Sequence, residues 1–180
     1  MKRTLHSISF IIVSVLLTAC PYSSPYPLDE SPQQSIDESY LGKWATMVTK
    51  IIDDRHSKIE PVKVILTKKD DMEYNVAITG YIDEFVKYRI VTDDTIKGTA
   101  FLSTAVNKQF LNIDIAGRIY LAEVKKDDGT FSIYPLSDYF TNKMIKSTPA
   151  LRNALEFHYK TRLNPSYDED FMLKDLKRVN

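Results

Sequence analysis

Cysteine, histidine and glycine are scarce in this chain of 180 residues. Cys20 is the single cysteine, so no internal disulfide can form, and stability has to come from burying apolar surface. His56 and His158 are the only histidines after residue 20, so a zinc site would need carboxylate ligands, which is unusual. With five glycines, the chain contains no phosphate-binding glycine loop, no dinucleotide fingerprint and no Gly-x-Ser-x-Gly motif. The sequence therefore predicts no cofactor, no metal site and no enzymatic activity.

A surplus of positive charge is also missing. The chain has 24 lysines and arginines against 24 aspartates and glutamates. Nucleic-acid binding needs a basic surface that displaces counterions, so we expect no nucleic-acid partner. The carboxylates are numerous, but the sequence singles out no pair for glycosidase-like chemistry. An envelope hydrolase is therefore only a third hypothesis, which would require convergent carboxylates in a cleft or a histidine beside a hydroxyl.

No apolar run is long enough to cross a membrane as a helix. The main run, from Ile8 to Leu17, is interrupted by two serines, whereas a spanning helix needs about 20 apolar residues. Lys2 and Arg3 precede this run and small residues follow it. This order is typical of a secretory signal peptide, which we place at residues 1–19.

The signal peptide ends in Leu17-Thr18-Ala19-Cys20, which resembles the lipobox of bacterial lipoproteins. The resemblance implies cleavage after Ala19, a diacylglycerol thioether on the sulfur of Cys20 and acylation of its new amine. Two or more acyl chains hold a protein stably on a bilayer, whereas one chain binds marginally. The expected partner is therefore the membrane, through acylated Cys20. The alternatives are an ordinary signal peptide with an incidental cysteine, or an uncleaved anchor.

The segment after Cys20 bears on which membrane carries the protein and on how far the folded domain stands from it. In Gram-negative lipoproteins an aspartate after the cysteine tends to retain the protein in the inner membrane. Pro21 stands there instead, which implies the cell envelope and, in a Gram-negative source, the outer membrane. Prolines, serines and glutamines then recur up to Ser39, as in an extended linker. We therefore predict a lipid-anchored tether over residues 20–39 and a folded domain over residues 40–180.

The domain opens with period-two alternation of apolar and polar residues, which is typical of half-buried strands. The alternation predicts about eight short strands, around residues 45–52, 62–66, 74–78, 86–90, 100–106, 111–115, 119–124 and 131–133. No helix-length pattern interrupts them, which favours antiparallel neighbours over a parallel sheet. The predicted fold is mainly β, an antiparallel meander that closes into a small barrel able to hold one ligand.

The period changes after the strands. Ser137 is a candidate cap for a short helix over residues 138–145. Thr148 followed by proline predicts the start of a second helix, with His158 on its apolar face as a partly buried structural histidine. His56 is expected in solvent. In residues 169–178 the apolar positions fit neither period, and we predict a closing strand there.

Four acidic doublets fall between the predicted strands, at Asp53-Asp54, Asp70-Asp71, Asp93-Asp94 and Asp127-Asp128. Aspartates in such positions either bind calcium or bond nearby backbone amides in turns. A calcium loop needs several oxygens at fixed spacing around a glycine turn, and this spacing is missing. We interpret the doublets as turn residues.

The first strand carries a family resemblance. Gly42-Lys43-Trp44 resembles the Gly-x-Trp motif of lipocalins, and the order of strands, helix and short strand is also similar to theirs. The resemblance implies that Trp44 plugs the closed end of the barrel under a late basic residue, for which Arg178 is the candidate. It also implies fatty acids or lysophospholipids as ligands. Ser137-Asp138-Tyr139 is the nearest match to the lipocalin Thr-Asp-Tyr motif, but it precedes helices. The chain also resembles small uncharacterised bacterial lipoproteins with a proline-rich linker and an early Leu-x-Gly-x-Trp, from which no activity carries over.

Two functions follow from these expectations. In the first, the anchored barrel binds a small apolar ligand such as a fatty acid or lysolipid, in an apolar pocket with few polar groups. The candidate interior residues are Trp44, Val64, Tyr74, Val76, Tyr88, Leu102, Ile113 and Ile119. In the second, the core is filled, and an aromatic surface or the helix from Pro149 to Leu163 contacts an envelope protein. A barrel filled by its own side chains would refute the first function.

Overall fold

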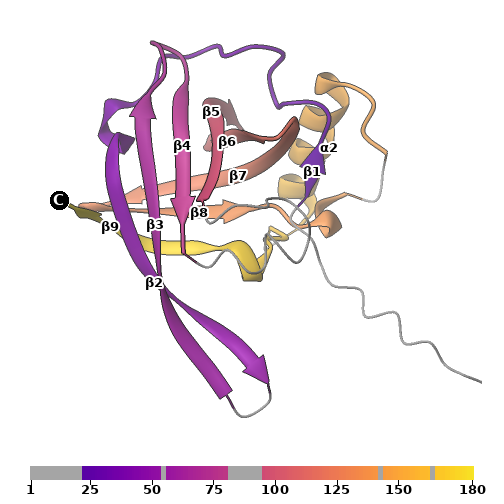
Figure 1. Cartoon of the computed structure of the whole chain (residues 1–180). Coiled ribbons are helices and arrows are strands. Elements are labelled where there is room, and N and C mark those ends of the chain that lie inside the picture. Colours follow the sequence, from indigo (N-terminus) through magenta and orange to yellow (C-terminus); the bar gives the residue numbers. More distant parts are fainter. Residues whose placement is uncertain (1–21, 54–55, 81–94, 142–143, 163–164) are drawn as a thin grey trace, which may run out of the picture.

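The described residues form an antiparallel β-barrel of eight strands with an α-helix against its wall (Figure 1). A computed structural model describes residues 22–53, 56–80, 95–141, 144–162 and 165–180. The barrel strands are β2 (Gly42–Asp53), β3 (His56–Lys68), β4 (Tyr74–Thr79), β5 (Thr95–Ala105), β6 (Lys108–Ile115), β7 (Arg118–Asp127), β8 (Thr130–Pro135) and β9 (Leu173–Val179). Each pairs antiparallel with the next, and β9 closes the barrel between β8 and β2. The predicted fold class is confirmed.

The closing strand is confirmed at the tail of the chain. A short 3-10 turn, η3 (Glu169–Phe171), leads into β9. Leu173 and Leu176 both point into the core although they are three residues apart. Asp175 between them has a positive φ of 51°, and the pairing with β8 shifts register there. This irregularity explains why the apolar spacing fits neither period. The strand predicted at residues 86–90 lies outside the described residues.

The prediction for β7 had the wrong face inward. Tyr120, Ala122 and Val124 belong to the barrel core, whereas Ile119 is only partly buried. Leu121 on the opposite face belongs to a second core outside the barrel. Because both faces of β7 are buried, its residues do not alternate between apolar and polar, and the period cannot reveal the phase.

The second core lies between the barrel wall and α2 (Thr148–Thr161). Leu151, Leu155 and His158 form the buried face of α2, as the helical spacing predicts. The hydroxyl of Ser147 caps the helix by accepting from the Ala150 amide at 3.3 Å, one residue earlier than predicted. The predicted helix over 138–145 is only a 3-10 turn, η2 (Asp138–Phe140), although Ser137 caps it as expected. In the sequence, Phe140 is followed by the polar residues Thr141, Asn142 and Lys143, which offer no apolar side chain to continue a buried helix face.

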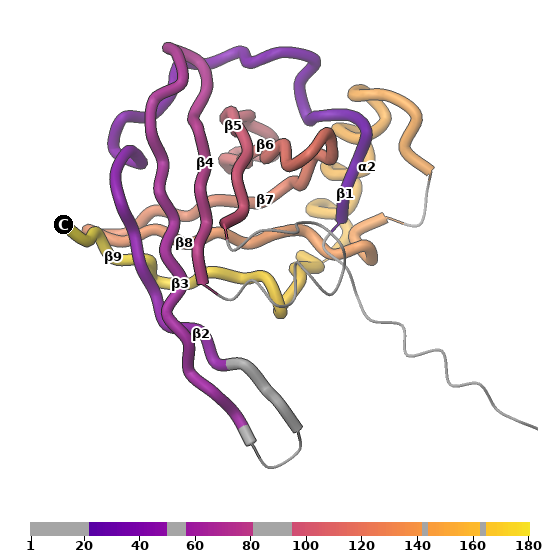
Figure 2. Tube along the Cα trace, in the orientation of Figure 1, coloured from indigo at the N-terminus to yellow at the C-terminus, as the bar shows by residue number. Residues whose placement is uncertain are grey.

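Residues 22–39 do not form a free tether, which corrects the predicted boundary at residue 40. We call them the N-terminal strap, and Figure 2 follows them from β1 (Ser23–Ser24) over the barrel to η1 (Glu38–Tyr40). Leu28 is fully buried in the second core, and its amide donates to Asn112 Oδ1 at 2.6 Å. Burial of the Leu28 side chain holds the strap on the barrel, although the composition around Leu28 is typical of a linker. Among the described residues, the buried hydrophobic side chains run from Leu28 in the strap to Leu176 in β9.

Candidate functional site

One end of the barrel is closed by an aromatic plug, as the lipocalin resemblance implies. Trp44 is buried, and its indole nitrogen donates to the Tyr40 carbonyl at 2.8 Å. Its ring meets the Phe131 ring edge to face, with centroids 4.7 Å apart. The guanidinium carbon of Arg178 lies 4.7 Å from the Trp44 ring centroid, so Arg178 is the late basic partner. This end is filled by side chains.

Gly42 is the residue that lets the plug and its arginine meet. Its φ of 129° lies in a region that L-residues rarely adopt. A Cβ at this position would stand 3.2 Å from Arg178 Nη1. Arg178 also donates to the Ser39 carbonyl at 3.1 Å. The glycine of the Gly-x-Trp motif therefore leaves room for Arg178 over the indole.

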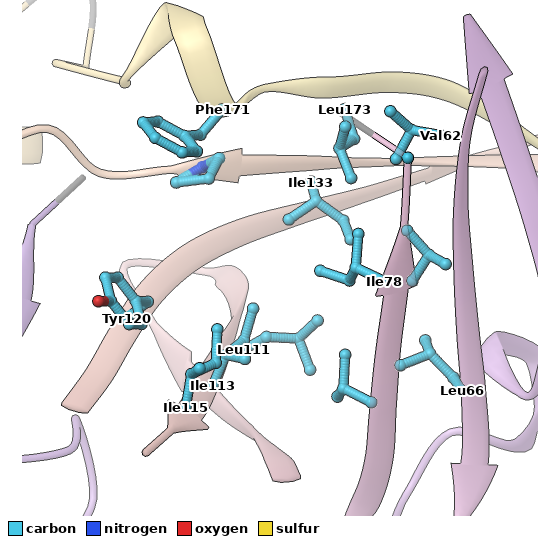
Figure 3. Close-up of a pocket in the computed structure, with 14 residues that line it drawn as sticks. Val62, Leu66, Ile78, Leu111, Ile113, Ile115, Tyr120, Ile133, Phe171 and Leu173 are labelled. Carbon is cyan, nitrogen blue, oxygen red and sulfur yellow. The ribbon is translucent and has the colours of Figure 1, made fainter. Parts of the chain in front are cut away.

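Beside the plug, the barrel interior contains a cavity of about 60 Å³ (Figure 3). It is lined by Val62, Val64, Leu66, Val76, Ile78, Gly80, Leu111, Ile113, Ile115, Tyr120, Ile133, Pro135, Phe171 and Leu173. Aliphatic side chains dominate this lining, and Figure 3 shows the Tyr120 hydroxyl directed away from them. Genuinely apolar cavities stay dry and accept apolar guests.

The cavity is small for a ligand site. Sites for drug-sized ligands usually measure about 300–1,000 Å³. A cavity of about 60 Å³ holds only a few methylene groups unless its lining moves. The arrangement therefore suits the end of one acyl chain rather than a whole lipid.

Three of the candidate interior residues line this cavity, namely Val64, Val76 and Ile113. Trp44, Tyr74 and Leu102 lie in the same core without lining it. Ile119 does not belong to the core, for the reason given for β7, and its place is taken by Tyr120. Tyr88 and the predicted lipid-attachment residue Cys20 lie outside the described residues. Sequence reasoning missed Pro135 and Phe171, because neither belongs to an alternating run.

A buried carboxylate lies on the outer wall, between β7 and α2. Glu123 accepts hydrogen bonds from Lys108 Nζ at 2.7 Å, from the Tyr159 hydroxyl at 2.6 Å and from the Tyr167 hydroxyl. Burial would raise the pKa of Glu123, but these three donors outweigh it and hold the pKa below its ordinary value. Burial and the adjacent carboxylate raise the pKa of both tyrosines. A carboxylate with three donors is positioned to fasten the helix to the barrel.

Two further titratable side chains, His158 and Asp70, accept hydrogen bonds from backbone amides. His158 Nε2 accepts from the Ser166 amide at 2.9 Å, and burial and Arg162 lower the pKa of this histidine. Asp70 Oδ1 accepts from the amides of Met72 and Glu73, which is the turn chemistry predicted for the doublets. Within the described ranges, no group of three or more His, Cys, Asp or Glu side chains could hold a metal ion.

Asp168 is a carboxyl group that is buried without a full set of hydrogen-bond partners. Its Oδ1 accepts from the Asp170 amide at 3.1 Å, whereas its Oδ2 has no hydrogen-bond partner. Burial raises the pKa of Asp168 to about 6, and the charges of Asp170, Asp138 and Glu169 act in the same direction. The ionised form therefore destabilises the fold.

We expect Asp168→Asn to raise the free energy of unfolding at pH 7 by about 1 kcal/mol. A carboxyl with a folded pKa of about 6 and an ordinary unfolded value near 3.8 makes the fold less stable as pH rises between them. The advantage of the variant should therefore vanish near pH 4. Urea denaturation from pH 4 to 7 measures it, with the exposed turn variant Asp128→Asn as the control. An advantage that does not change with pH would contradict this explanation.

An open groove runs along α2. The segment from Asp138 to Ile145 forms its other side, with residues 142 and 143 outside the described chain. Tyr139, Met144 and Phe157 are among its lining residues and are largely exposed. The groove lies along the helix whose contact with a protein partner is one of the two functions expected from the sequence.

No protein-family model matches the sequence, and the searches of curated proteins and of solved structures found no match either. Among the described residues, no helix has the length and apolar character needed to cross a membrane.

Proposed function

We propose that this chain is a lipid-anchored envelope protein whose barrel accommodates the end of an apolar chain, such as that of a fatty acid or lysolipid. The observation that carries the proposal is the apolar cavity inside the barrel, which Trp44 does not line. Tyr120 and Pro135 both line it. Tyr120 pairs with Ser23 of β1, and Pro135 precedes Leu136, whose carbonyl accepts from the Tyr22 amide. The described chain thus begins beside the cavity.

The position of Tyr22 brings the proposed anchor close to the barrel. Cys20 precedes Tyr22 by two residues, and two extended residues reach about 7 Å. The Tyr22 amide is fixed by a 2.8 Å bond to the Leu136 carbonyl. An acylated Cys20 would therefore hold the barrel directly at the bilayer. In this arrangement an apolar guest does not have to travel far through water.

Mass spectrometry of the chain purified from bacterial membranes tests both parts of the proposal. Under denaturing conditions we expect a chain that starts at Cys20 and carries the mass of a diacylglycerol and one further acyl group. Under native conditions, released from mild detergent and incubated with palmitate or a lysophospholipid, it should gain one ligand mass. Val62→Phe, which fills the cavity, should reduce this adduct at least tenfold.

Val179→Phe is the matched control, because Val179 is exposed on β9 and does not line the cavity. It should bind the ligand like the unchanged chain. Near-ultraviolet circular dichroism of Trp44 verifies that each variant is folded. A clean apo mass with every lipid would overturn the binding proposal, and an unmodified Cys20 would overturn the anchor.

The second candidate function is that of an interaction protein. The observation that favours it is the groove beside α2, where Phe157 is 67% and Met144 81% exposed. Large exposed apolar side chains around a groove are typical of interaction sites. Chemical cross-linking in intact cells would capture such a partner if the cavity proves unable to bind lipid.

A further inference from the structure

Besides the cavity, the structure contains a two-stranded arm, formed by residues 46–53 of β2 and residues 56–62 of β3. β2 pairs with β9 only through Lys43–Ala45, and β3 pairs with β4 only from Lys63 onward. Among the described residues, the parts of β2 and β3 that continue outward pair with each other alone, up to Asp53 and His56. Figure 1 shows this arm running out past the end of the barrel at which β4 ends. An isolated two-stranded hairpin is marginally stable in water.

One face of the arm is apolar and exposed. Met47 is opposite Pro61, and Ile59 is two residues from Pro61, so all three lie on the same face. The exposed fractions are 60% for Met47 and 62% for Ile59. Val48, on the other face, packs against the barrel core. The exposed face therefore lacks a covering element in the described chain.

The arm leaves the barrel at the end where the described residues begin. Val62 at its base and Ile78 at the end of β4 line the cavity, as does Tyr120, the partner of Ser23. The Tyr22 ring contacts the Phe140 ring edge to face, with centroids 4.4 Å apart. The cavity thus reaches the end of the barrel at which the arm and the first described residue lie.

We infer that the exposed face of the arm lies in the interfacial layer of the bilayer that carries the Cys20 anchor. This inference rests on the proposed anchor. With Cys20 two residues from Tyr22, the bilayer surface has to lie close to this end of the barrel. Apolar side chains enter the headgroup and acyl boundary to a depth of about 5–10 Å. Met47 and Ile59 supply such side chains.

A second contact supports the same orientation. Tyr139 is 56% exposed and lies in η2, next to the Phe140 ring that touches Tyr22. Tyrosines are favoured at the membrane interface, where their rings sit among the headgroups. With contacts from η2 and from the arm, the barrel stands with its cavity end toward the lipid. An acyl chain can then pass from the bilayer toward the cavity.

Spin labelling tests the inference on the mature, membrane-purified protein. A thioether-linked Cys20 has no free thiol, and the chain has no other cysteine, so Ile59→Cys can be labelled selectively. The labelled protein is reconstituted into vesicles of phosphatidylethanolamine and phosphatidylglycerol. We expect the label at residue 59 to collide at least threefold more with oxygen, relative to a water-soluble nickel chelate, than the control label. The control is Val179→Cys, which lies on β9 beyond the Trp44 plug.

The outcomes separate this inference from the anchor on which it rests. Equal nickel accessibility at residues 59 and 179 would overturn the membrane-facing arm. An immobilised label at residue 59 that is shielded from both reagents would indicate a protein contact and would also overturn it. If the unchanged protein itself accepts the label, Cys20 is free, and the anchor proposal fails instead. Met47→Cys repeats the measurement one step nearer the barrel, should Ile59→Cys fold poorly.

Discussion

Replacing Glu123 with leucine is expected to lower the free energy of unfolding by about 3 kcal/mol. The leucine would leave the hydroxyls of Tyr159 and Tyr167 without their acceptor in a buried site. An unsatisfied buried donor costs about 1–3 kcal/mol. Lys108 can turn its ammonium to water, because its side chain is 36% exposed, so the tyrosines account for most of the loss. Urea denaturation of the purified protein, followed by Trp44 fluorescence, measures the change.

The matched control for this network is Glu156→Gln. Glu156 pairs with Lys160 on the exposed side of α2, at 3.4 Å and four residues apart. Exposed pairs of this kind contribute about 0.3–0.5 kcal/mol. Similar losses in the two variants would show that Glu123 does not fasten α2 to the barrel.

The same carboxylate predicts how stability changes in acid. The folded pKa of Glu123 lies below its ordinary value, so its contribution is present above the unfolded pKa and is lost as pH falls through the folded one. The contribution of Asp168 to stability changes with pH in the opposite direction. Because its folded pKa is raised, this contribution becomes less favourable as pH rises. The leucine variant at position 123 should therefore lose less stability in acid than the unchanged chain.

The barrel itself could be predicted because most of its strands are buried on one face only. In β4, Tyr74, Val76 and Ile78 are buried and alternate with more exposed residues, and this alternation is visible in the sequence. β7 carries no such signal, since α2 and the strap cover its outer face. In β9 the positive φ of Asp175 interrupts the period. Alternation thus finds strands but loses their phase where a second layer or an irregularity intervenes.

The N-terminal strap shows a different limit of composition. Its prolines and serines are typical of a linker, and no repeat or periodicity indicates that it packs. Leu28 nevertheless fits between the wall and α2, and Asn112 supplies the acceptor for its amide. The binding partner of the strap is a surface formed by distant residues, which a local pattern cannot reveal. The same holds for Pro135 and Phe171 in the cavity.

The second large effect is expected at the plug, where Trp44→Ala should lower the free energy of unfolding by about 3–5 kcal/mol. The substitution removes the ring between Phe131 and Arg178 and the hydrogen bond to the Tyr40 carbonyl. Because Trp44 is the single tryptophan, far-ultraviolet circular dichroism has to follow the denaturation. Trp44→Phe keeps an aromatic ring in place and should lose less than half as much.

Arg178→Ala separates the cation from the ring. Arg178 is exposed, and a cation over an aromatic ring at such a site contributes about 0.5–1 kcal/mol. In the Trp44→Phe background, part of this contribution should persist, whereas in the Trp44→Ala background it should disappear. An unchanged loss in both backgrounds would mean that Arg178 acts through the Ser39 carbonyl alone.

The plug lies outside the cavity lining, so a folded Trp44→Phe protein should still gain the lipid adduct. That result would show that the plug and the proposed ligand binding are independent of each other.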